Sequence, residues 1–256
     1  MLFRTVYGAE LAAIYTYIQQ HTQKSGSIPS SMIYKSFVAS QMESLDENHH
    51  VDDALSFLTS ALLIQIKDDR VESLTNVTDF RLALLQNLRY LEIHGVEAGH
   101  PLDPYYMYLL DEIFIKTGRQ YVQDLHVEVN RLQVIQAVGG VSREKVSAWK
   151  RVMTSLGIGY RVSNGFLCLY SPGLLKSIID IWEDESDTLQ GFLEKHVEKY
   201  IPTFSRNGDL TPSLQSTLQH LSSEKVIDLY QLQDSPSRAF FDTRQYKGIR
   251  KRITHV

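Results

Sequence analysis

The stretch "VGGVSREKVSAWKRVMTSLGIGYRVSNGFLCLYSPG", residues 138–173, decides the fold that we expect for this chain. Two adjacent glycines end one short helix. Ser142 is a suitable N-cap for a second helix, which Gly157 ends. Alternating residues around Asn164 and Gly165 then predict a β-hairpin, because Asn-Gly favours a two-residue hairpin turn. The stretch therefore predicts a helix, a turn, a second helix and a hairpin.

A similar order of elements is predicted earlier and, more faintly, later in the chain. Apolar residues at helical spacing predict helices, and short alternating runs around turn residues predict hairpins. The predicted ranges are 9–23, 51–62 and 63–74 in the first series and 188–202, 211–225 and 226–241 in the last. We therefore expect a mainly α fold with small β-hairpins.

This order resembles the winged helix-turn-helix superfamily. The segment "GVSREKVSAWKRVMTSLGIGYRV" is similar to that family's turn, recognition helix and first wing strand. The resemblance is closest over residues 102–184, moderate over 9–76 and loose over 185–243. It implies a mainly α protein with small β-hairpin wings, arranged as tandem winged helix-turn-helix units, and it is a fold-level likeness shared by many functions.

The sequence divides into four segments on this interpretation. They are an acidic winged-helix-like unit at 1–76, a connecting helix and linker at 77–100, a winged helix-turn-helix at 101–184, and a third winged-helix-like unit with a basic C-terminal tail at 185–256. The run "GVEAGHPLDP", residues 95–104, has the composition of a linker.

Charge is distributed unevenly along the chain. Residues 1–100 carry 7 Lys and Arg against 12 Asp and Glu, and residues 101–184 carry 9 of each. The last twenty residues hold six basic residues and one acid. The N-terminal third should repel phosphate, whereas the C-terminal tail should attract it.

Composition excludes several classes of protein. The apolar fraction of 43% and the charged fraction of 22% are typical of a soluble globular chain. No apolar run approaches the ~18 residues that span a bilayer, and Glu10 interrupts the N-terminal apolar stretch, so we expect neither membrane contact nor a signal peptide. The single cysteine, Cys168, fits a reducing compartment. We expect a cytoplasmic protein, with the nucleoid or nucleus as alternatives.

The helix after Ser142 has one apolar and one polar face. At 100° per residue the apolar face comprises Val146, Trp149, Val152, Met153 and Leu156. The opposite face comprises Arg143, Ser147, Lys150, Arg151 and Thr154. Arginine can make two hydrogen bonds to guanine, and hydroxyls and lysine can reach phosphate. This face predicts contact with double-stranded DNA; the alternative is a solvated or protein-facing helix surface.

Two further segments could reach the DNA backbone. Arg161 and Asn164 lie in the predicted hairpin that follows this helix. The C-terminal run interleaves an aromatic residue with the cations Arg244, Lys247, Arg250, Lys251 and Arg252. It has the composition of a basic arm that binds phosphate, and the alternative is a disordered tail.

The corresponding helix of the N-terminal unit carries no cation on its outward face. That face offers Asp52, Asp53, Ser56 and Thr59. Carboxylates near a helix start suit the helix dipole and oppose phosphate. We therefore expect this unit to bind a second copy of the chain or another protein.

Motifs for enzyme chemistry are missing from the sequence. It contains no phosphate-binding loop, nucleophile elbow or dinucleotide fingerprint. His49 and His50 lie near Asp52 and Asp53, but such groups at a helix start are more often solvated. Cys168 reads as a buried structural thiol. We expect no enzyme activity, no cofactor and no metal.

The function predicted first is therefore a non-enzymatic DNA-binding winged-helix protein within a dimer or a multi-protein complex. The alternative is a protein–protein adaptor subunit of a larger DNA-processing or chromosome-organising complex. The tandem winged-helix subunits that bind kleisins in SMC complexes are similar in outline, and an acidic balance suits that role.

Overall fold

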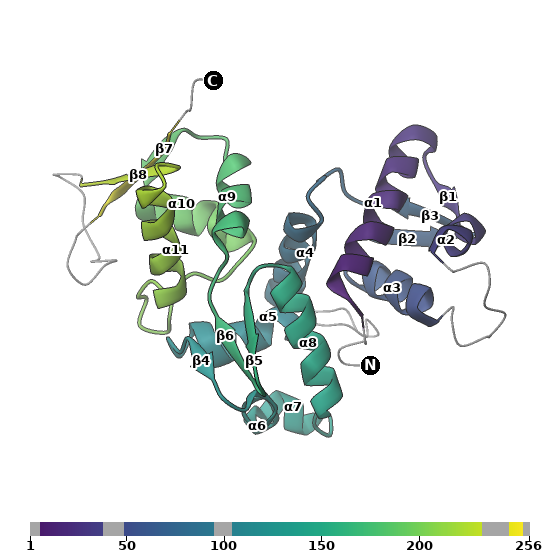
Figure 1. The fold of residues 1–256 in the computed structure, drawn as a ribbon, viewed down its shortest axis with the longest axis horizontal. Helices are drawn as coiled ribbons and strands as arrows, with labels where there is room; N and C mark the ends of the chain where they lie inside the picture. Colours follow the sequence, from purple (N-terminus) through teal and green to yellow (C-terminus); the bar gives the residue numbers. More distant parts are fainter. Residues whose placement is uncertain (1–5, 38–48, 95–103, 232–245, 253–256) are drawn as a thin grey trace. The chain divides into compact units, whose positions relative to one another are not determined.

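The computed structural model describes residues 6–37, 49–94, 104–231 and 246–252. Contacts between residues define two compact units. Unit 1 comprises Met1–Met107 and Asn130–Leu156, and unit 2 comprises Tyr108–Val129 and Gly157–Val256. The described residues are mainly helical, with three small antiparallel sheets, as the predicted fold class requires at this level (Figure 1). The four segments predicted from the sequence stay a prediction.

The first series of elements lies in unit 1. It comprises α1 (Gly8–Ser25), β1 (Ile28–Pro29), α2 (Ser30–Phe37), α3 (His49–Ser60), β2 (Ile64–Lys67), β3 (Arg70–Ser73) and α4 (Phe80–His94). The strands form the first sheet, in the order β1-β3-β2. Asp68 and Asp69 join β2 to β3 with φ of 48° and 58°. The predicted hairpin around a charged turn is therefore confirmed.

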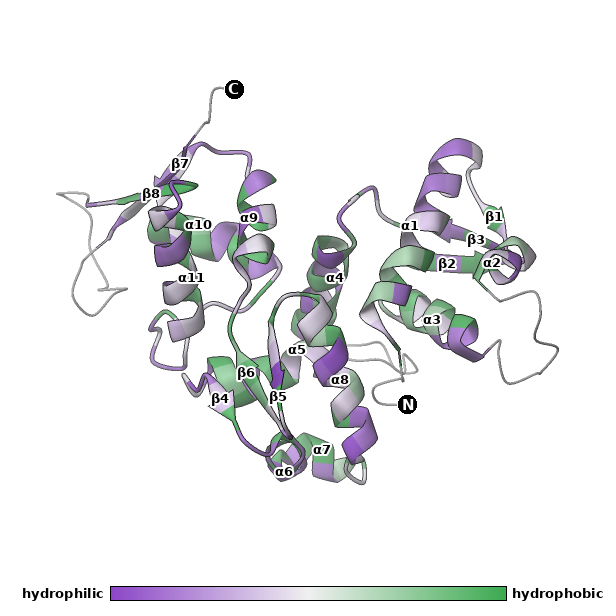
Figure 2. Ribbon diagram, in the orientation of Figure 1, coloured by the Kyte–Doolittle hydropathy of each residue, from purple (hydrophilic) through white to green (hydrophobic). Residues whose placement is uncertain are grey.

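Helices α1, α3 and α4 of this series each bury an apolar face. The predicted face of α1 is buried at Leu11, Ile14, Tyr15 and Ile18. Figure 2 shows α3 hydrophilic at its start and hydrophobic along the rest. On α4, the Asn87 amide donates to the carbonyl oxygens of Ala61 and Leu62 at 2.9 Å, which satisfies the carbonyl groups left free where α3 ends.

The second series comprises α5 (Pro104–Leu110), β4 (Tyr121–Val122), α6 (Leu125–Arg131), α7 (Gln133–Ala137), α8 (Arg143–Ser155), β5 (Gly159–Val162) and β6 (Gly165–Cys168). A π-helical turn, Asp111–Ile115, continues α5. The strands form the second sheet, in the order β4-β6-β5, within unit 2. Helix α8 belongs to unit 1, whereas the second sheet belongs to unit 2.

The third series lies in unit 2. It comprises α9 (Pro172–Asp180), β7 (Ser186–Thr188), α10 (Leu189–Lys195), a 3₁₀ turn (Val197–Lys199), α11 (Pro212–Ser223), β8 (Ile227–Tyr230) and β9 (Gly248–Lys251). The strands form the third sheet, in the order β7-β9-β8, and α9 packs against α11. Pro172 opens α9 and the Ser171 hydroxyl accepts from the Leu174 amide, as expected of a proline-led, capped helix.

Of the hairpin predicted over 226–241, the described residues contain the first strand, β8. Strand β8 pairs with β9, so Tyr230 lies opposite Gly248. Residues 232–245 lie outside the described part of the chain. The strand that pairs with β8 thus comes from beyond the predicted range, and the pair buries Ile227 and Ile249.

The first two sheets each contain one strand that the sequence analysis missed, β1 and β4, and the third contains two, β7 and β9. The same order of helix, strand, helical segments and two strands thus occurs three times among the described residues, and in each sheet the last strand lies in the middle.

Candidate functional site

Helix α8 has the predicted N-cap and the predicted apolar face. The Ser142 hydroxyl accepts a hydrogen bond from the amide of Lys145. The apolar residues Val146, Trp149, Val152, Met153 and Leu156 are all buried. The Trp149 indole donates to the carbonyl oxygen of Tyr106 at 3.0 Å, so a buried polar group is satisfied within unit 1.

The predicted outward face of α8 is only partly outward. Arg143 is exposed and Ser147 is half-buried. Lys150 is only 5% exposed, so its predicted placement on the outward face is wrong. Helix α1 packs on α8 in unit 1, and a helix covered by a second neighbour buries more of its circumference than one apolar stripe predicts. The long alkyl stem of lysine allows this burial.

The C-terminal half of α8 meets the start of α1. Arg151 and Thr154 are half-buried, which corrects their predicted exposure. The guanidinium of Arg151 lies over the Tyr7 ring, 5.0 Å from its centre. A Cβ atom on Gly8 would overlap the Ser155 side chain, so a glycine is needed for this close approach. The C-terminal half of α8 is therefore in contact with Tyr7 and α1 inside unit 1.

The second sheet has a buried face and an exposed apolar face. Val122, Phe166 and Cys168 are buried, and the rings of Phe114 and Phe166 lie 5.7 Å apart. On the other face Leu167 lies opposite both Tyr121 and Tyr160. These tyrosines are 45% and 46% exposed.

Val162 lies two residues after Tyr160 on the same face of β5 and is also exposed. We call Tyr121, Tyr160, Val162 and Leu167 the sheet patch. The predicted DNA contacts Arg161 and Asn164 are exposed beside it.

The basic C-terminal residues are part of the fold rather than a free arm. Residues 248–251 form β9, so a disordered tail is wrong for this strand, and binding of phosphate by its cations stays a prediction. Arg250 and Arg252 pair with the Asp228 carboxylate at 3.3 and 2.5 Å. Lys251 donates to the Trp182 carbonyl oxygen and lies 5.7 Å from the centre of that indole.

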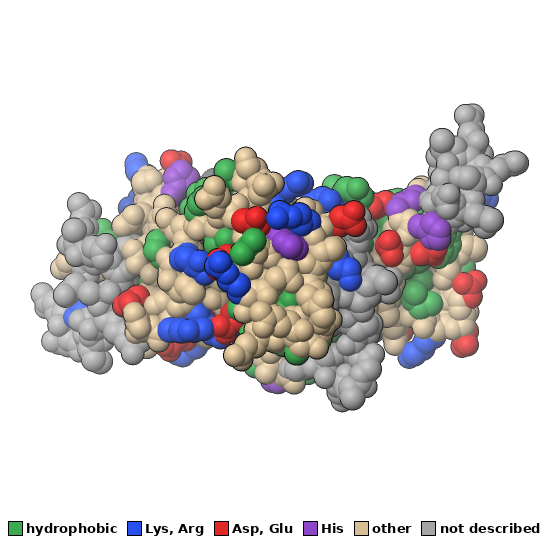
Figure 3. Space-filling model, turned by 90° about the horizontal axis from the view of Figure 1, so that it is seen from below, with side chains coloured by type: hydrophobic (Ala, Val, Ile, Leu, Met, Phe, Trp, Pro, Cys, Tyr) green, Lys and Arg blue, Asp and Glu red, His purple; other side chains and the backbone are tan. Residues whose placement is uncertain are grey.

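Two other cations of the predicted tail are placed differently. Lys247 is half-buried, and Arg244 lies outside the described residues. On the face drawn in Figure 3, Lys and Arg side chains lie beside Asp and Glu side chains.

The predicted partner face of α3 is partly engaged by its neighbours. Asp52 is exposed and accepts a hydrogen bond from the Tyr34 hydroxyl. Burial and, next, this carboxylate raise the pKa of Tyr34 to about 12. The residues Asp53, Ser56 and Thr59 are half-buried, and the Thr59 hydroxyl donates to the Leu55 carbonyl oxygen at 2.8 Å.

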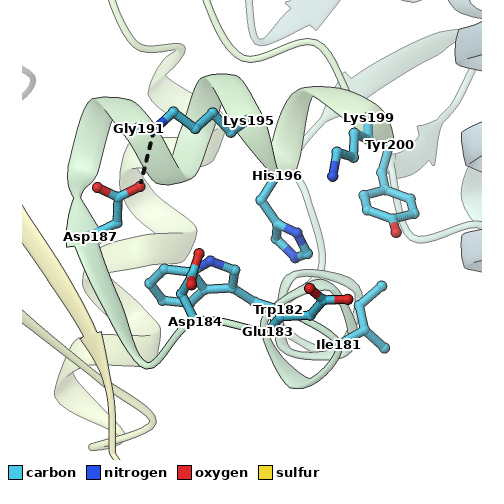
Figure 4. A pocket seen from close by; sticks show the side chains of 10 residues that line it. All are labelled: Ile181, Trp182, Glu183, Asp184, Asp187, Gly191, Lys195, His196, Lys199 and Tyr200. Carbon is cyan, nitrogen blue, oxygen red and sulfur yellow. Dashed lines mark ion pairs between the residues drawn. The ribbon is translucent and has the colours of Figure 1, made fainter.

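A pocket that the sequence analysis missed lies in the third series. It is about 280 Å³ and is lined by Ile181, Trp182, Glu183, Asp184, Asp187, Gly191, Lys195, His196, Lys199 and Tyr200. His196 projects into its middle, and Lys195 pairs with Asp187 at 3.9 Å along one side (Figure 4). The residues come from the segment after α9, from β7, from α10 and from the 3₁₀ turn that follows, and they form no sequence motif.

His196 closes the C-terminal end of α9. Its Nε2 lies 2.6 Å from the carbonyl oxygen of Ile178, and because a carbonyl only accepts, Nε2 carries the hydrogen. Burial lowers the pKa of His196 most, and the hydrogen bond with Ile178 raises it. The positive charges of Lys199 and Lys251 lower it further. The pKa of His196 therefore lies below its ordinary value of 6.5.

Comparisons with known proteins give no family for the chain. No family model matches it, and neither the curated proteins nor the solved structures contain a significant match. In the described residues, no helix has the length and apolar character to cross a membrane. The same residues contain no group of three or more His, Cys, Asp or Glu side chains placed to hold a metal ion.

Proposed function

We propose that this chain is a non-enzymatic adaptor, built of tandem winged-helix units, that holds a partner protein within a larger assembly. The sheet patch carries this proposal. Two exposed tyrosines on one face of a sheet, on either side of Leu167, are typical of protein interfaces, where aromatic residues are enriched. A sheet that lies along DNA needs cations, and Arg161 is the only Lys or Arg among the residues of β4, β5 and β6.

The state of the predicted DNA contacts also supports an adaptor. A protein that binds a duplex uses Lys and Arg side chains that are free to neutralise phosphates. Here Lys150 is buried and Arg151 is stacked on Tyr7. Arg250 and Arg252 already share a carboxylate. Lys150 and Arg151 are thus withdrawn from the surface, and Arg250 and Arg252 are exposed but already paired with Asp228.

The experiment compares partner capture by three forms of the full chain. Tyr121→Ser with Tyr160→Ser removes the rings of the sheet patch, and Tyr90→Ser removes an exposed tyrosine of α4 as a matched control. A partner identified with the wild type is purified and titrated against each form. We expect the double variant to bind at least about tenfold more weakly, since buried interface aromatics contribute ≥ ~2 kcal/mol, and the control to bind unchanged.

Equal affinity of all three forms would remove the sheet patch from the interface. A circular dichroism melt of each form separates this result from unfolding.

Binding of double-stranded DNA is the second candidate function. It is favoured by the exposure of Arg143 at the start of α8 and of Arg161 on β5. If DNA is the ligand, Arg143→Ala with Arg161→Ala should weaken duplex binding by about 1–3 kcal/mol per base-reading arginine. Unchanged gel-shift affinity would exclude both arginines as readers.

A further inference from the structure

The pocket around His196 lies at the negative end of a helix. The C-terminal end of a helix attracts cations, and at the end of α9 the carbonyl oxygens of Ser177 and Ile179 accept hydrogen bonds from the amides of Ile181 and Trp182. The ammonium of Lys251 donates to the carbonyl oxygen of Trp182, two residues beyond the end of α9. The fold thus places one cation of its own at this helix end.

His196 presents an unused acceptor to the pocket. The residue is only 8% exposed, and its Nε2–H is committed to the Ile178 carbonyl oxygen. In the neutral ring Nδ1 therefore carries a lone pair. Within the described residues, Nδ1 has no hydrogen-bond partner, although the ring lines the pocket and projects into its middle (Figure 4). A ligand that satisfies this atom must bring a donor.

The lining of the pocket carries three carboxylates, Glu183, Asp184 and Asp187, and two lysines, Lys195 and Lys199. Asp187 and Lys195 pair with each other, which leaves Glu183 and Asp184 in the lining with Lys199, and Lys251 lies beside Trp182. Two carboxylates, a histidine acceptor and a helix C-terminus together favour a positively charged donor. Lys199 and Lys251 oppose it and limit the affinity.

We propose that this pocket binds a guanidinium or ammonium group, with Glu183, Asp184 and His196 Nδ1 as its acceptors. A volume of about 280 Å³ is below the ~300–1,000 Å³ of pockets for drug-sized ligands and suits one side-chain head group. The source is either a basic side chain of a protein or a free organic cation. The inference does not depend on the adaptor function, since the pocket and its charges lie within unit 2.

The test titrates the full chain with small probes and follows the two indole NMR signals. Trp182 lines the pocket, and Trp149 lies in unit 1 as an internal reference. The probes are N-acetyl-arginine amide, N-acetyl-lysine amide, spermidine and inorganic phosphate. We expect saturable shifts of the Trp182 signal alone with at least one cation at millimolar concentrations, and none with phosphate. A response to the amino-acid amides alone indicates a protein side chain, and a response to spermidine alone indicates a free cation.

Substitutions of the charged lining residues test whether the pocket prefers a positively charged ligand. Glu183→Gln and Asp184→Asn should each weaken cation binding about three- to fivefold, as expected for a partly exposed ion pair. Lys199→Ala should strengthen it. Glu194→Gln, on the exposed surface of α10 outside the pocket, is the matched control. Failure of every cation to shift Trp182 would overturn the proposal, as would phosphate binding that Lys199→Ala abolishes.

Discussion

The guanidinium of Arg151 and the ring of Tyr7 stack at 5.0 Å, and this contact joins the last turn of α8 to the residue before α1. A cation over an aromatic face is attracted by the ring quadrupole. Arg151, which the sequence predicts to contact DNA, therefore stabilises unit 1 through its contact with Tyr7. Its partner lies in the acidic N-terminal segment, far away in sequence.

We predict that Arg151→Ala destabilises the protein by about 0.5–1 kcal/mol, the usual range for a cation–aromatic contact near the surface. Urea unfolding followed by circular dichroism measures the change. Arg143→Ala, on the exposed start of the same helix, should stay within about 0.5 kcal/mol of the wild type. Equal effects of the two substitutions would show that the Tyr7 contact contributes nothing. Tyr7→Phe keeps the ring and should behave like the wild type.

A second prediction concerns the pH dependence of stability. Because the pKa of folded His196 lies below 6.5, the unfolded chain takes up a proton first as the pH falls. The free energy of unfolding should therefore be fully retained above pH 6.5, decrease between 6.5 and the lower folded pKa, and level off below it. Lys199 and Lys251 strengthen this effect, and Asp184 opposes it.

The measurement is urea unfolding of the wild type and of His196→Gln across this pH range. The variant should be less stable at neutral pH, since the contact with Ile178 is altered. The slope of its free energy of unfolding against pH should correspond to up to about one proton fewer taken up on unfolding. If both forms show the same slope between pH 6.5 and pH 5, another group titrates there.

A third prediction concerns the single cysteine. Burial raises the pKa of the Cys168 thiol to about 12. Since the thiolate is the reactive form, native protein at pH 8 should not react with a disulfide reagent, and denatured protein should react fully. Glu194→Cys adds an exposed thiol on α10 and should react at once under native conditions. Rapid labelling of the wild type without denaturant would contradict the burial of this side chain.

A fourth prediction concerns Asp228, which holds two arginines. Asp228→Asn releases Arg250 and Arg252 and should strengthen non-specific duplex binding. The slope of log affinity against log salt should become steeper by ~0.9 for each additional phosphate that the released arginines neutralise. Gel shifts at several salt concentrations measure this slope. Asp209→Asn, in an exposed loop, is the charge-matched control. The same slope for both variants would mean that the arginines cannot reach a duplex.

Local signals in the sequence predicted the elements that depend on local chemistry. Ser142 as N-cap, Pro172 at a helix start and the charged turn between β2 and β3 all lie where expected. At the hairpin of the second sheet, the turn is formed by Ser163 and Asn164, and Gly165 already belongs to β6. A Cβ there would overlap the carbonyl oxygen of Val122, so this glycine is needed for strand pairing rather than for the turn.

Features that depend on distant partners were not predictable from local signals. Strands β1 and β4 have two residues each, too few to show alternation, and each is a strand only because a later strand pairs with it. The helical wheel of α8 places Lys150 outward because it contains no information about α1. The pocket around His196 combines a helix end with two later segments that no spacing rule connects.

The middle position of the last strand in each sheet has a consequence for the order of folding during synthesis. A chain that grows from its N-terminus makes both edge strands of a sheet before the strand that joins them. For the first two sheets the delay is one short turn, since β3 and β6 follow their neighbours at once. In the third sheet, β7 and β8 must wait for residues 231–247 to be synthesised before β9 can pair with both. During that interval the edges of β7 and β8 are open to other strands. The third sheet is therefore the sheet of the nascent protein most exposed to mispairing.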